Sequence, residues 1–515
     1  MSFSNSGMYS SIENKVKNVN EVLEALGQFP RTGGEIVHCH GTFDVVHPGH
    51  LRQLSYAKTQ GKFLVVSITS DRFISKAGVR PYVPQEMRLV NLSALSLVDY
   101  VILNDEETPV ELIKELKPDI FIKGPDYAHL ISTKTSEEKS AVESYGGRMS
   151  FSPGDYVMSS TKLIQDRNIN LSSEKAKLLI DQEEISVSQF EDVCSKFSGT
   201  SVLLVGDTIV DRITNATTIG VSGKTPTIST KKINSEDFIG GAAIVALHLA
   251  AAGADVHFVT LLGSDTEGEW VREKLASGGV KLIGIDESGR STTLKEVFDV
   301  DGYRLLKMDR VNNSPISFES RIQICKAIEQ TKKGIVIFSD FRHGIFDKDS
   351  CPSYLQSLQP GVTSAADSQV ASRWGNILDF TGVTLITANE KEARYSLGDQ
   401  DSSLRPLGEA LFAKSKAEFA ILKAGREGAI GYRRELKGND PRHFFVLDSF
   451  ARGVVDAVGA GDALLAYASL AWHHKAGPII ASILGIAAAS LECEKEGNYP
   501  LNPDEIMSRV REVLT

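Results

Sequence analysis

The segment His40–His50, HGTFDVVHPGH, constrains the fold of this chain more than any other feature of its sequence. The apolar stretch Glu35–Cys39 before it is typical of a buried strand, and Pro48–Gly49 suits the first turn of a helix. A helix that begins there points free N–H groups and the positive end of its dipole at one place, beside the imidazoles of His47 and His50. The segment therefore predicts a strand-to-helix junction that binds phosphate, in a domain with a parallel α/β sheet.

This segment, from Gly41 on, reads Gly-x-Phe-Asp-x-x-His-x-Gly-His and resembles the signature of the cytidylyltransferase-like nucleotidyltransferases. The resemblance implies that two histidines stabilise the α-phosphate of a nucleoside triphosphate while a substrate phosphate attacks it and pyrophosphate leaves. Such a reaction depends on positioning and charge neutralisation rather than on a covalent nucleophile. His40 stands where close relatives carry Asn, so the preference of the site for a particular nucleotide base or acceptor substrate stays open. The catalytic residues that the resemblance implies are His47, His50 and Lys123, and the implied nucleotide or phosphate ligands are Gly41, Thr42, Phe43, Asp44, Arg88, Ser159, Ser160 and Thr161.

A second phosphate motif, DAVGAGD at Asp456–Asp462, precedes the apolar helical run Ala463–Leu470. Small residues permit a tight turn in which consecutive backbone amides point at one anion. Asp462 would stand at the start of the helix, where a carboxylate can accept a proton from an attacking hydroxyl while the amides stabilise the transferring phosphoryl group. The motif predicts a site of phosphoryl transfer in the second half of the chain.

This second half resembles the ribokinase-like (PfkB) sugar kinases. The resemblance implies that Asp462 is the catalytic base and that Mg²⁺ accompanies the nucleotide near Glu392, with no other metal ligand assigned. The nucleotide or phosphate ligands that it implies are Asn389, Glu392, Lys423, Gly425, Gly428, Gly459, Ala460 and Gly461. The implied sugar-binding residues are Asp207, Asp211, Gly240, Gly241 and Asp340.

At 515 residues the chain is long enough for two or more domains. We expect an N-terminal tail with an amphipathic lead-in helix at residues 1–34 and a Rossmann-like nucleotidyltransferase domain at 35–165. Linker helices at 166–200 and a ribokinase-like α/β domain with a small β lid at 201–515 complete the predicted organisation. Ser222–Thr225, SGKT, ends like a Walker A loop, but Thr218 replaces the first glycine of that motif, so we expect lid or loop there.

The net charge of −10 argues against a general nucleic-acid binder. Five cysteines without a Cys-x-x-Cys pair indicate neither a disulfide framework nor a zinc site. The first residues lack an apolar signal segment, and apolar stretches are too short to cross a membrane. We therefore expect a cytoplasmic protein with neither nucleic-acid nor membrane partners.

Together the two halves resemble the bifunctional heptose-7-phosphate kinase/heptose-1-phosphate adenylyltransferases, with the two domains in reversed order. The resemblance implies ATP, a sugar phosphate and a second nucleoside triphosphate as substrates, and a homodimer formed through the kinase lid. Three departures surround the implied sugar site: Ile244 stands where the family carries Asn, Lys224 where it carries an acid, and His343 where it carries Lys. These changes favour the same chemistry on a related sugar.

Two alternatives stay open at the level of sequence. The same two reactions would act on another sugar or an alditol, with CTP in place of ATP as the nucleotidyl donor. In a different class, the chain would be a nucleotide-binding regulatory protein with one inactive half. The acceptor sugar, the oligomeric state and the passage of product between the sites do not follow from the residues.

Overall fold

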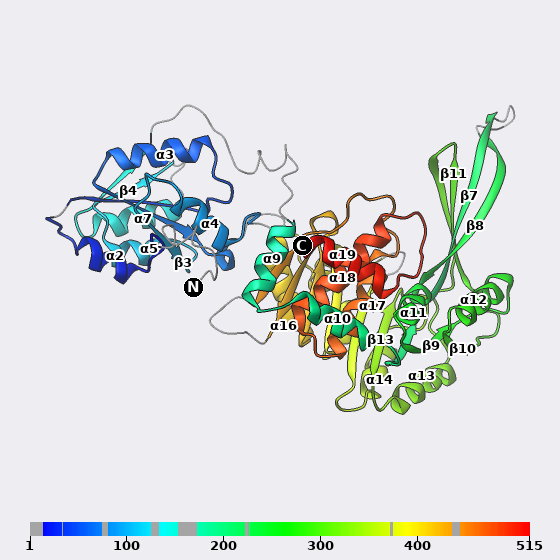
Figure 1. The fold of residues 1–515 in the computed structure, drawn as a ribbon. Helices are drawn as coiled ribbons and strands as arrows, with labels where there is room; N and C mark the ends of the chain where they lie inside the picture. The colour runs from blue at the N-terminus through cyan, green and yellow to red at the C-terminus, as the bar shows by residue number, and fades with distance from the viewer. Residues whose placement is uncertain are drawn as a thin grey trace. The chain divides into compact units, whose positions relative to one another are not determined.

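The computed structural model of the chain describes residues 14–32, 34–74, 81–124, 133–152, 172–221, 225, 227–370, 374–434 and 443–514 (Figure 1). The chain divides into two compact units, Met1–Leu171 and Ser172–Thr515. Both units are α/β, as the sequence predicted.

The N-terminal unit is built on a parallel five-stranded sheet in the order β3-β2-β1-β4-β5. Its strands are β1 Ile36–Gly41, β2 Phe63–Thr69, β3 Tyr100–Asn104, β4 Ile120–Lys123 and β5 Arg148–Phe151. Its helices are α2 Val19–Leu26, α3 Pro48–Thr59, α4 Gln85–Ser93, α5 Val110–Leu116 and α7 Thr133–Glu143, with a short 3₁₀ helix, η1, at Asp71–Phe73. The strand expected at Glu35–Cys39 is β1, and the helix expected to begin at Pro48 is α3.

Helices cover both faces of this sheet, because side chains alternate between the faces along each strand. Ile36 of β1 packs in a cluster with residues of α2 and α5, whereas its neighbour Val37 packs with residues of α3 and α4. The order of the strands reverses between β1 and β4, and ligands of open α/β sheets bind at the carboxyl ends of the strands beside such a reversal. These ends are Gly41 and Lys123, so the sheet brings two predicted site segments together.

A nine-stranded sheet in the order β10-β9-β6-β13-β14-β15-β16-β17-β18 forms the centre of the C-terminal unit, and β17 and β18 are its antiparallel edge. The strands are β6 Ser201–Gly206, β9 Asp255–Leu261, β10 Lys281–Ile285, β13 Ile335–Asp340, β14 Thr363–Ser368, β15 Leu385–Asn389, β16 Phe419–Lys423, β17 Ala429–Arg433 and β18 Phe444–Leu447. Here the order reverses between β6 and β13.

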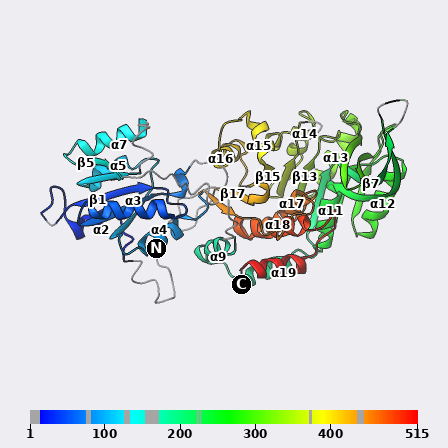
Figure 2. The same cartoon turned by 90° about the horizontal axis from the view of Figure 1, so that it is seen from above.

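Two layers of helices enclose this sheet, and Figure 2 shows α14, α15 and α16 on one side with α11, α17 and α18 on the other. The helices of the unit are α9 Ser172–Gln182, α10 Val187–Ser195, α11 Ala242–Ala251, α12 Thr266–Ser277, α13 Phe318–Gln330, α14 Ser350–Gln356, α15 Glu390–Leu397, α16 Leu404–Ser415, α17 Ala460–His473, α18 Gly477–Cys493 and α19 Pro503–Leu514, with short 3₁₀ helices η2 at Ile377–Phe380 and η3 at Gly425–Glu427. Almost every residue from Asp462 to Ala471 is buried, which holds α17 rigidly under the motif that begins it.

The predicted β lid is a separate four-stranded sheet in the order β12-β11-β7-β8. Its strands are β7 Thr208–Val221, β8 Ile228–Gly241, β11 Thr293–Val300 and β12 Tyr303–Arg310. β7 follows β6 at the reversal of strand order, and β8 leads directly into α11, so the lid is attached at the end of the large sheet where ligands bind. The Walker-like segment falls in the connection from β7 to β8, and residues 222–224 of it lie outside the described residues.

The helices expected in the linker, α9 and α10, belong to the C-terminal unit. Ile180, Phe190 and Phe197 are buried in its large apolar core, and Lys175 forms an ion pair with Asp448 at 2.9 Å. The polar composition of 166–200 suggested an exposed connector, but its regularly spaced apolar residues cover the core of the kinase-like unit instead.

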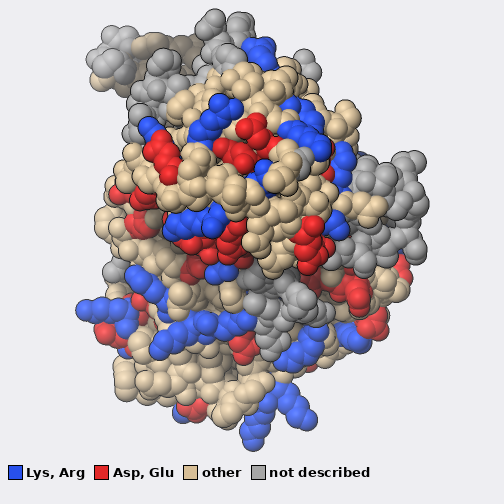
Figure 3. Space-filling model, turned by 90° about the vertical axis from the view of Figure 1, so that its left-hand side faces the viewer, with Lys and Arg blue, Asp and Glu red and all other residues tan. Residues whose placement is uncertain are grey.

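On the face of the molecule that Figure 3 shows, Lys and Arg side chains are interspersed with Asp and Glu side chains. Among the helices that the structure describes, none is long and apolar enough to cross a bilayer.

Candidate active sites

The two predicted histidines are fixed by the first turn of α3. The backbone N–H of Gly49 donates to His47 Nδ1 at 3.1 Å, and that of His47 donates to His50 Nδ1 at 3.4 Å. Because both Nδ1 atoms accept, the proton of each neutral ring is on Nε2. The rings stack with their centroids 3.8 Å apart, and burial lowers the pKa of His47. The arrangement supplies two adjacent N–H donors at the positive end of a helix dipole.

The loop between β1 and α3 is tied down by Arg88, which the sequence had assigned to the nucleotide. The side chain of Arg88 is completely buried and donates to the carbonyl oxygens of Thr42, Thr69 and Val83 at 2.5, 2.9 and 3.0 Å, and to Asp71 Oδ1 at 2.6 Å. All four of these acceptors belong to the protein, so in this structure Arg88 fixes the loop, and its predicted contact with the nucleotide stays a prediction. Asp44 acts in the same way, since its Oδ1 accepts from the backbone N–H of Val83 at 2.8 Å.

His40 is held by the neighbouring strand. Its Nδ1 lies 2.8 Å from Ser67 Oγ and its Nε2 lies 3.1 Å from Thr69 Oγ1, and Ser67 Oγ also bonds with His38 Nε2 at 2.7 Å. Burial, with the charges of His38 and Lys123, lowers the pKa of His40 well below its usual value. A neutral ring with both nitrogens engaged thus occupies the position of the expected Asn.

Lys123 ends β4 and forms a buried ion pair with Glu138 of α7. Because Cys39 is paired with Ile122 in the sheet, Lys123 lies beside His40 at the strand reversal. Burial raises the pKa of Glu138, and the lysine opposes that rise. The sequence did not suggest Glu138, since it stands in a polar helix that otherwise suits an exposed face. Three further predicted residues of this site, Ser159, Ser160 and Thr161, lie outside the described residues.

A cavity of about 620 Å³ lies beside the strand reversal of the C-terminal unit, a size typical of small-molecule sites. The predicted residues that line it come from the lid, from the ends of strands β15 and β16, from the turn after β16 and from the glycine turn. They are Asp211, Gly241, Asn389, Lys423, Gly425, Gly428, Gly459, Ala460, Gly461 and Asp462. The tertiary structure therefore brings ten predicted residues to one cavity, although they span much of the unit.

Asp462 stands in the first turn of α17, after a turn in which Gly459 has a φ of 80°. Its Oδ1 is buried and has no hydrogen-bond partner among the described residues. Burial, together with the charge of Asp367, raises the pKa of Asp462 well above its usual value, and Lys423 opposes this. A raised pKa makes the carboxylate a stronger base, which suits proton abstraction from a hydroxyl.

Lys423 lies against the glycine turn. Its Nζ is 2.6 Å from Asp367 Oδ1 and 4.0 Å from Glu392 Oε2, and a Cβ added to Gly461 would lie 3.3 Å from the same Nζ. The ammonium group is thus adjacent to the backbone amides that the motif directs at an anion. This cluster can neutralise the charge of a transferring phosphoryl group.

Glu392 differs from the prediction. Both of its carboxylate oxygens accept hydrogen bonds from Asn389, one from the backbone N–H and one from Nδ2, each at 2.6 Å. Its own N–H donates back to Asn389 Oδ1 at 2.9 Å, so the pair forms a capping box at the start of α15. Asn389 lines the cavity and Glu392 does not, which makes the glutamate a support for the asparagine.

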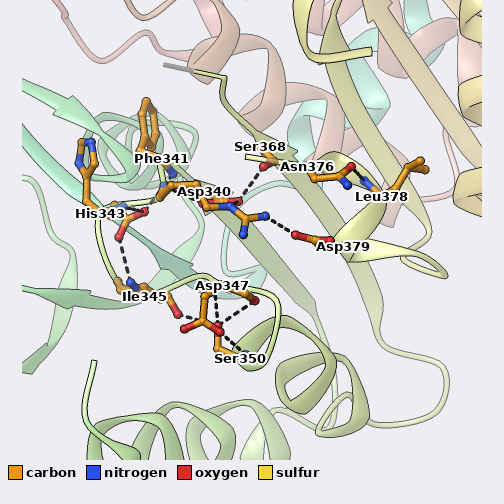
Figure 4. Close-up of polar contacts among 12 residues, drawn as sticks. Asp340, Phe341, His343, Ile345, Asp347, Ser350, Ser368, Asn376, Leu378 and Asp379 are labelled. Carbon is orange, nitrogen blue, oxygen red and sulfur yellow. Dashed lines mark hydrogen bonds and ion pairs between the residues drawn. The ribbon is translucent and has the colours of Figure 1, made fainter. Parts of the chain in front are cut away.

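Two acids assigned to the sugar, Asp207 and Asp340, are buried outside the cavity lining. Asp207 accepts from the backbone N–H groups of Phe341 and His343 at 2.9 and 3.2 Å, and burial with the charge of Asp340 raises its pKa to about 7. Asp340 accepts from Arg342 Nε at 2.8 Å and from Ser368 Oγ at 2.6 Å (Figure 4). In this structure both carboxylates hold the loop after β13, and their predicted contact with the sugar stays a prediction.

Gly240 also lies outside the lining, but it has a role there. A side chain at this position would overlap Asp211 Oδ2, so the glycine leaves room for the acid that does line the cavity. Ile244, expected near the sugar, is fully buried in the apolar core of the unit, which removes it as a sugar contact.

The sequence missed two lysines of the lid that line the cavity, Lys295 on β11 and Lys307 on β12. Lys295 is paired in register with Asp211 of β7, and its Nζ lies 5.7 Å from the ring centroid of Phe341. Burial lowers the pKa of Lys295, and Asp211 counteracts the effect. Isolated lysines in a strand carry no sequence signal of a site, and only the pairing of β11 with β7 brings them to the cavity.

Apolar side chains from the loop before the glycine turn and from α17 and α18 also line the cavity. They are Val454, Val458, Leu464, Ile486, Ala489 and Cys493. Such side chains suit an aromatic base, and the acids and lysines of the lining suit a polar acceptor.

The folds and the two candidate sites define the class: a Rossmann-like domain with a stacked histidine pair at a strand-to-helix junction, joined to a ribokinase-like domain with a β lid and a glycine turn before Asp462. In agreement, the sequence model of the cytidylyltransferase-like family matches residues 38–189, and that of the pfkB family carbohydrate kinases matches residues 199–505. The second match covers more than half of the chain, and the chain belongs to the pfkB family of carbohydrate kinases.

The chain is homologous to bifunctional HldE proteins, with its two domains in reversed order. HldE of Paramagnetospirillum magneticum is 28% identical over 328 residues, which are 62% of this chain and 65% of that protein. HldE of Koribacter versatilis is 39% identical over 153 residues, or 29% of this chain and 31% of that protein. HldE of Campylobacter curvus is 42% identical over 120 residues, or 23% and 25%. Each match thus spans less than two thirds of the relative.

Among solved structures, a mutant of phosphofructokinase-2 from Escherichia coli superposes with a TM-score of 0.51 at 16% identity, covering 62% of this chain and all of that one. The same enzyme in complex with substrates and products gives a TM-score of 0.50, again at 16% identity over 62% of this chain and 100% of that chain. At this identity the likeness shows the fold of the C-terminal unit alone.

Proposed function

We propose that the chain makes a nucleotide sugar in two steps. The C-terminal unit phosphorylates a sugar phosphate with ATP, and the N-terminal unit transfers a nucleotidyl group to the resulting sugar 1-phosphate with release of pyrophosphate. The observation that carries the proposal is Asp462, a buried acid beside the glycine turn and Lys423 whose Oδ1 has no partner among the described residues, in a cavity that lid lysines also line.

In the kinase step the acceptor is the anomeric hydroxyl of the sugar. Asp462 accepts its proton, the hydroxyl oxygen forms a bond with the γ-phosphorus of ATP, and the bond to the β-phosphate oxygen breaks so that ADP leaves. The amides of Gly459–Gly461 and the ammonium of Lys423 stabilise the charge on the transferring group. The apolar side chains that line the cavity contact the adenine.

A divalent cation fits this site through its donor chemistry. Asp462 lines the cavity, and its Oδ1, a carboxylate oxygen of the kind that Mg²⁺ prefers, has no partner among the described residues. The described residues contain no cluster of three metal-ligating side chains, so phosphate oxygens and water would complete the coordination. The cation would supply neutralisation of the triphosphate charge.

In the nucleotidyl step an oxygen of the sugar 1-phosphate forms a bond with the α-phosphorus of the nucleoside triphosphate, and pyrophosphate leaves. His47 and His50, at the start of α3, donate hydrogen bonds from Nε2–H to the oxygens of this α-phosphate, and Lys123 at the end of β4 adds a positive charge. By resemblance to the bifunctional HldE relatives we propose ATP as donor and a heptose 7-phosphate as the first acceptor.

A phosphorylated acceptor is favoured by the charges of the lid. Lys295 and Lys307 line the same cavity as the acids Asp211 and Asp462, and their two ammonium groups attract an anionic group of the acceptor. The second candidate is the same pair of reactions on a different sugar or an alditol with CTP. This second candidate is favoured by His343, which stands where the resembled family carries lysine and whose ring lies near Phe341 of the cavity lining.

The experiment is mass spectrometry of the products formed when purified protein receives ATP, CTP or GTP with heptose 7-phosphate, hexose 6-phosphates, an alditol phosphate and the unphosphorylated sugars. We expect a nucleotide sugar and both ADP and pyrophosphate only with a sugar phosphate. Absence of ADP and pyrophosphate release with every acceptor would instead support the regulatory alternative.

Separate lesions test the division of labour. Asp462→Asn should lower ADP formation by about a thousandfold or more but leave nucleotidyl transfer to supplied sugar 1-phosphate unchanged, because the amide cannot act as a base. His50→Ala should do the reverse. Two folded variants that each lose both reactions would contradict independent sites.

We also propose that the protein is a homodimer joined through its lids. Eight apolar or aromatic side chains of the lid strands are exposed, namely Ile219, Val221, Ile228, Ile233, Tyr303, Leu305, Leu306 and Met308. Light scattering of the wild type and of an Ile233→Lys variant tests this: a dimer should become a monomer, and a monomeric wild type would refute the proposal.

A further inference from the structure

Helix α9 precedes the part of the chain that matches the pfkB family model, which begins at residue 199, yet it is bonded to the strands beside the kinase cavity. Near the start of α9, Lys175 Nζ donates to both carboxylate oxygens of Asp448, which follows β18, at 3.0 and 2.9 Å. Just after the end of α9, Glu183 Oε1 accepts from Arg433 Nη1 of β17 at 2.6 Å. Both ends of α9 are therefore fixed to the antiparallel edge of the large sheet.

The ion pair of Lys175 and Asp448 is shielded from solvent. Only 6% of the lysine side chain and 14% of the aspartate side chain are exposed. Exposed ion pairs contribute little to a structure, whereas removing one partner of a buried pair has a large effect, because the other charge then stays in a poorly polar environment. The pair joins residues that are 273 positions apart in the chain, so it fixes the backbone at Asp448 relative to α9.

The backbone that this pair fixes borders the cavity. Ser449, the residue after Asp448, lines the cavity, and so does Gly428, which directly precedes β17. Gly428 has a φ of 95°, and a side chain added to it would overlap the backbone of Leu447 and Asp448. Two segments of the lining are thus packed against each other at Asp448, and a shift of this residue displaces both.

The other side of Ser449 is held by the C-terminal helices. The N–H of Phe450 donates to Ser490 Oγ of α18 at 3.1 Å, and its carbonyl oxygen accepts from Arg509 Nη1 of α19 at 2.6 Å. Ser449 therefore stands between two anchors. One comes from helices of the kinase-like fold, and the other comes from Lys175 in the segment that leads into it.

We propose, on the basis of the kinase function proposed above, that Lys175 is a positioning residue of the nucleotide site, because through Asp448 it fixes the backbone of Ser449 and Gly428 that lines the cavity. The lysine itself does not line the cavity. A small displacement of the lining weakens the contacts of a bound nucleotide, since binding depends on exact placement of the groups around it. The helix that leads into the kinase-like unit thus completes the site where ATP binds.

The test measures kcat and KM for ATP and for the acceptor by ADP release from the full chain. Lys175→Met removes the ammonium group from Asp448 at similar side-chain length, and Lys175→Arg keeps a charge that can bond both carboxylate oxygens. Glu183→Gln is the matched control, because it weakens the other anchor of α9, whose partner Arg433 is outside the cavity lining.

We expect Lys175→Met to raise the KM for ATP by roughly tenfold, with kcat and the KM for the acceptor within about twofold of the wild type, because a displaced wall weakens binding and leaves the catalytic acid in place. Lys175→Arg should keep the KM for ATP within about threefold. Glu183→Gln should lower the urea midpoint but leave the KM for ATP unchanged. Pyrophosphate release with supplied sugar 1-phosphate should be unchanged in all three variants, since the paired histidines belong to the other unit.

The inference is overturned if folded Lys175→Met keeps the wild-type KM for ATP, or if Glu183→Gln raises this KM as much, because the effect would then come from any loosening of α9. Should Lys175→Met not fold, Asp448→Asn decides: it weakens the same pair at equal volume, and it should raise the KM for ATP alone. A wild type that releases no ADP with any acceptor refutes the proposed function instead, and this outcome is seen before any variant is compared.

Discussion

Replacing Gly459 with alanine tests whether the anion-binding turn depends on the absence of a side chain. Gly459 has a φ of 80°, and an added Cβ would overlap Asn498 Oδ1 and lie 3.1 Å from Glu492 Oε1. Asn498 cannot move away without loss, because its Nδ2 donates to the carbonyl oxygen of Ile239 at 2.8 Å. The substitution therefore adds backbone strain and also displaces a buried amide.

Gly279 offers a matched control. Its φ is 78°, nearly that of Gly459, but a Cβ added there would meet no atom within 4 Å. For Gly279→Ala we expect only the strain of a left-handed residue, about 1 kcal/mol. For Gly459→Ala the same strain is joined by a broken hydrogen bond and an unpaired buried carbonyl, for a total of about 2–4 kcal/mol.

Urea denaturation of the full chain measures this difference. All three tryptophans, Trp270, Trp374 and Trp472, belong to the C-terminal unit, so their fluorescence follows the unfolding of that unit. Gly459→Ala should lose clearly more free energy of unfolding than Gly279→Ala, and it alone should raise the KM for ATP, because its turn lines the cavity. Equal losses in the two variants, or an unchanged KM for ATP in folded Gly459→Ala, would refute the reasoning.

Two further predictions concern buried charges. Burial raises the pKa of Glu492 to about 7 from a value of 4.5, so this group stabilises the fold at low pH and the contribution, about 3 kcal/mol, is lost as pH rises from 4.5 through 7. Glu492→Gln should thus raise the free energy of unfolding at pH 8 relative to the wild type but not at pH 4.5, unlike the exposed control Glu273→Gln; a constant offset at both pH values would speak against it. Arg88→Met should destabilise the N-terminal unit by about 3–5 kcal/mol, because it removes the guanidinium from Asp71 Oδ1 and from three carbonyl oxygens, whereas Arg72→Met on the exposed surface should cost less than about 0.5 kcal/mol. Hydrogen exchange of the peptides around β1 and α3 checks this, and unchanged protection in the Arg88 variant would contradict the role of the side chain as a clamp.

The site elements that could be predicted are those whose chemistry is local in the chain. The junction at Pro48, the stacked pair His47 and His50, and the turn before Asp462 each lie within a few residues, and helix starts and glycine turns depend on neighbours at that distance. Asn389 and Glu392 also form their pair within one helical turn.

The orientation of the predicted site residues does not follow from local sequence. Asp207 and Asp211 are both acids at the start of the lid, yet Asp207 is buried under the loop after β13 whereas Asp211 lines the cavity. Arg88, predicted to bind phosphate, donates to four protein acceptors that lie up to 46 residues away in the chain. The orientation of each side chain depends on partners that are remote in sequence, so no local pattern contains it.

The sequence by itself determined that this chain has two α/β units, each with a turn predicted to bind phosphate, because strand and helix periodicity and small-residue turns arise from neighbouring residues. Only the tertiary structure decided that Lys295 pairs in register with Asp211, that Lys123 forms an ion pair with Glu138, and that the ring of His343 is buried with no hydrogen-bond partner among the described residues. Burial and ion pairing follow from strand order and helix packing, which join residues far apart along the chain.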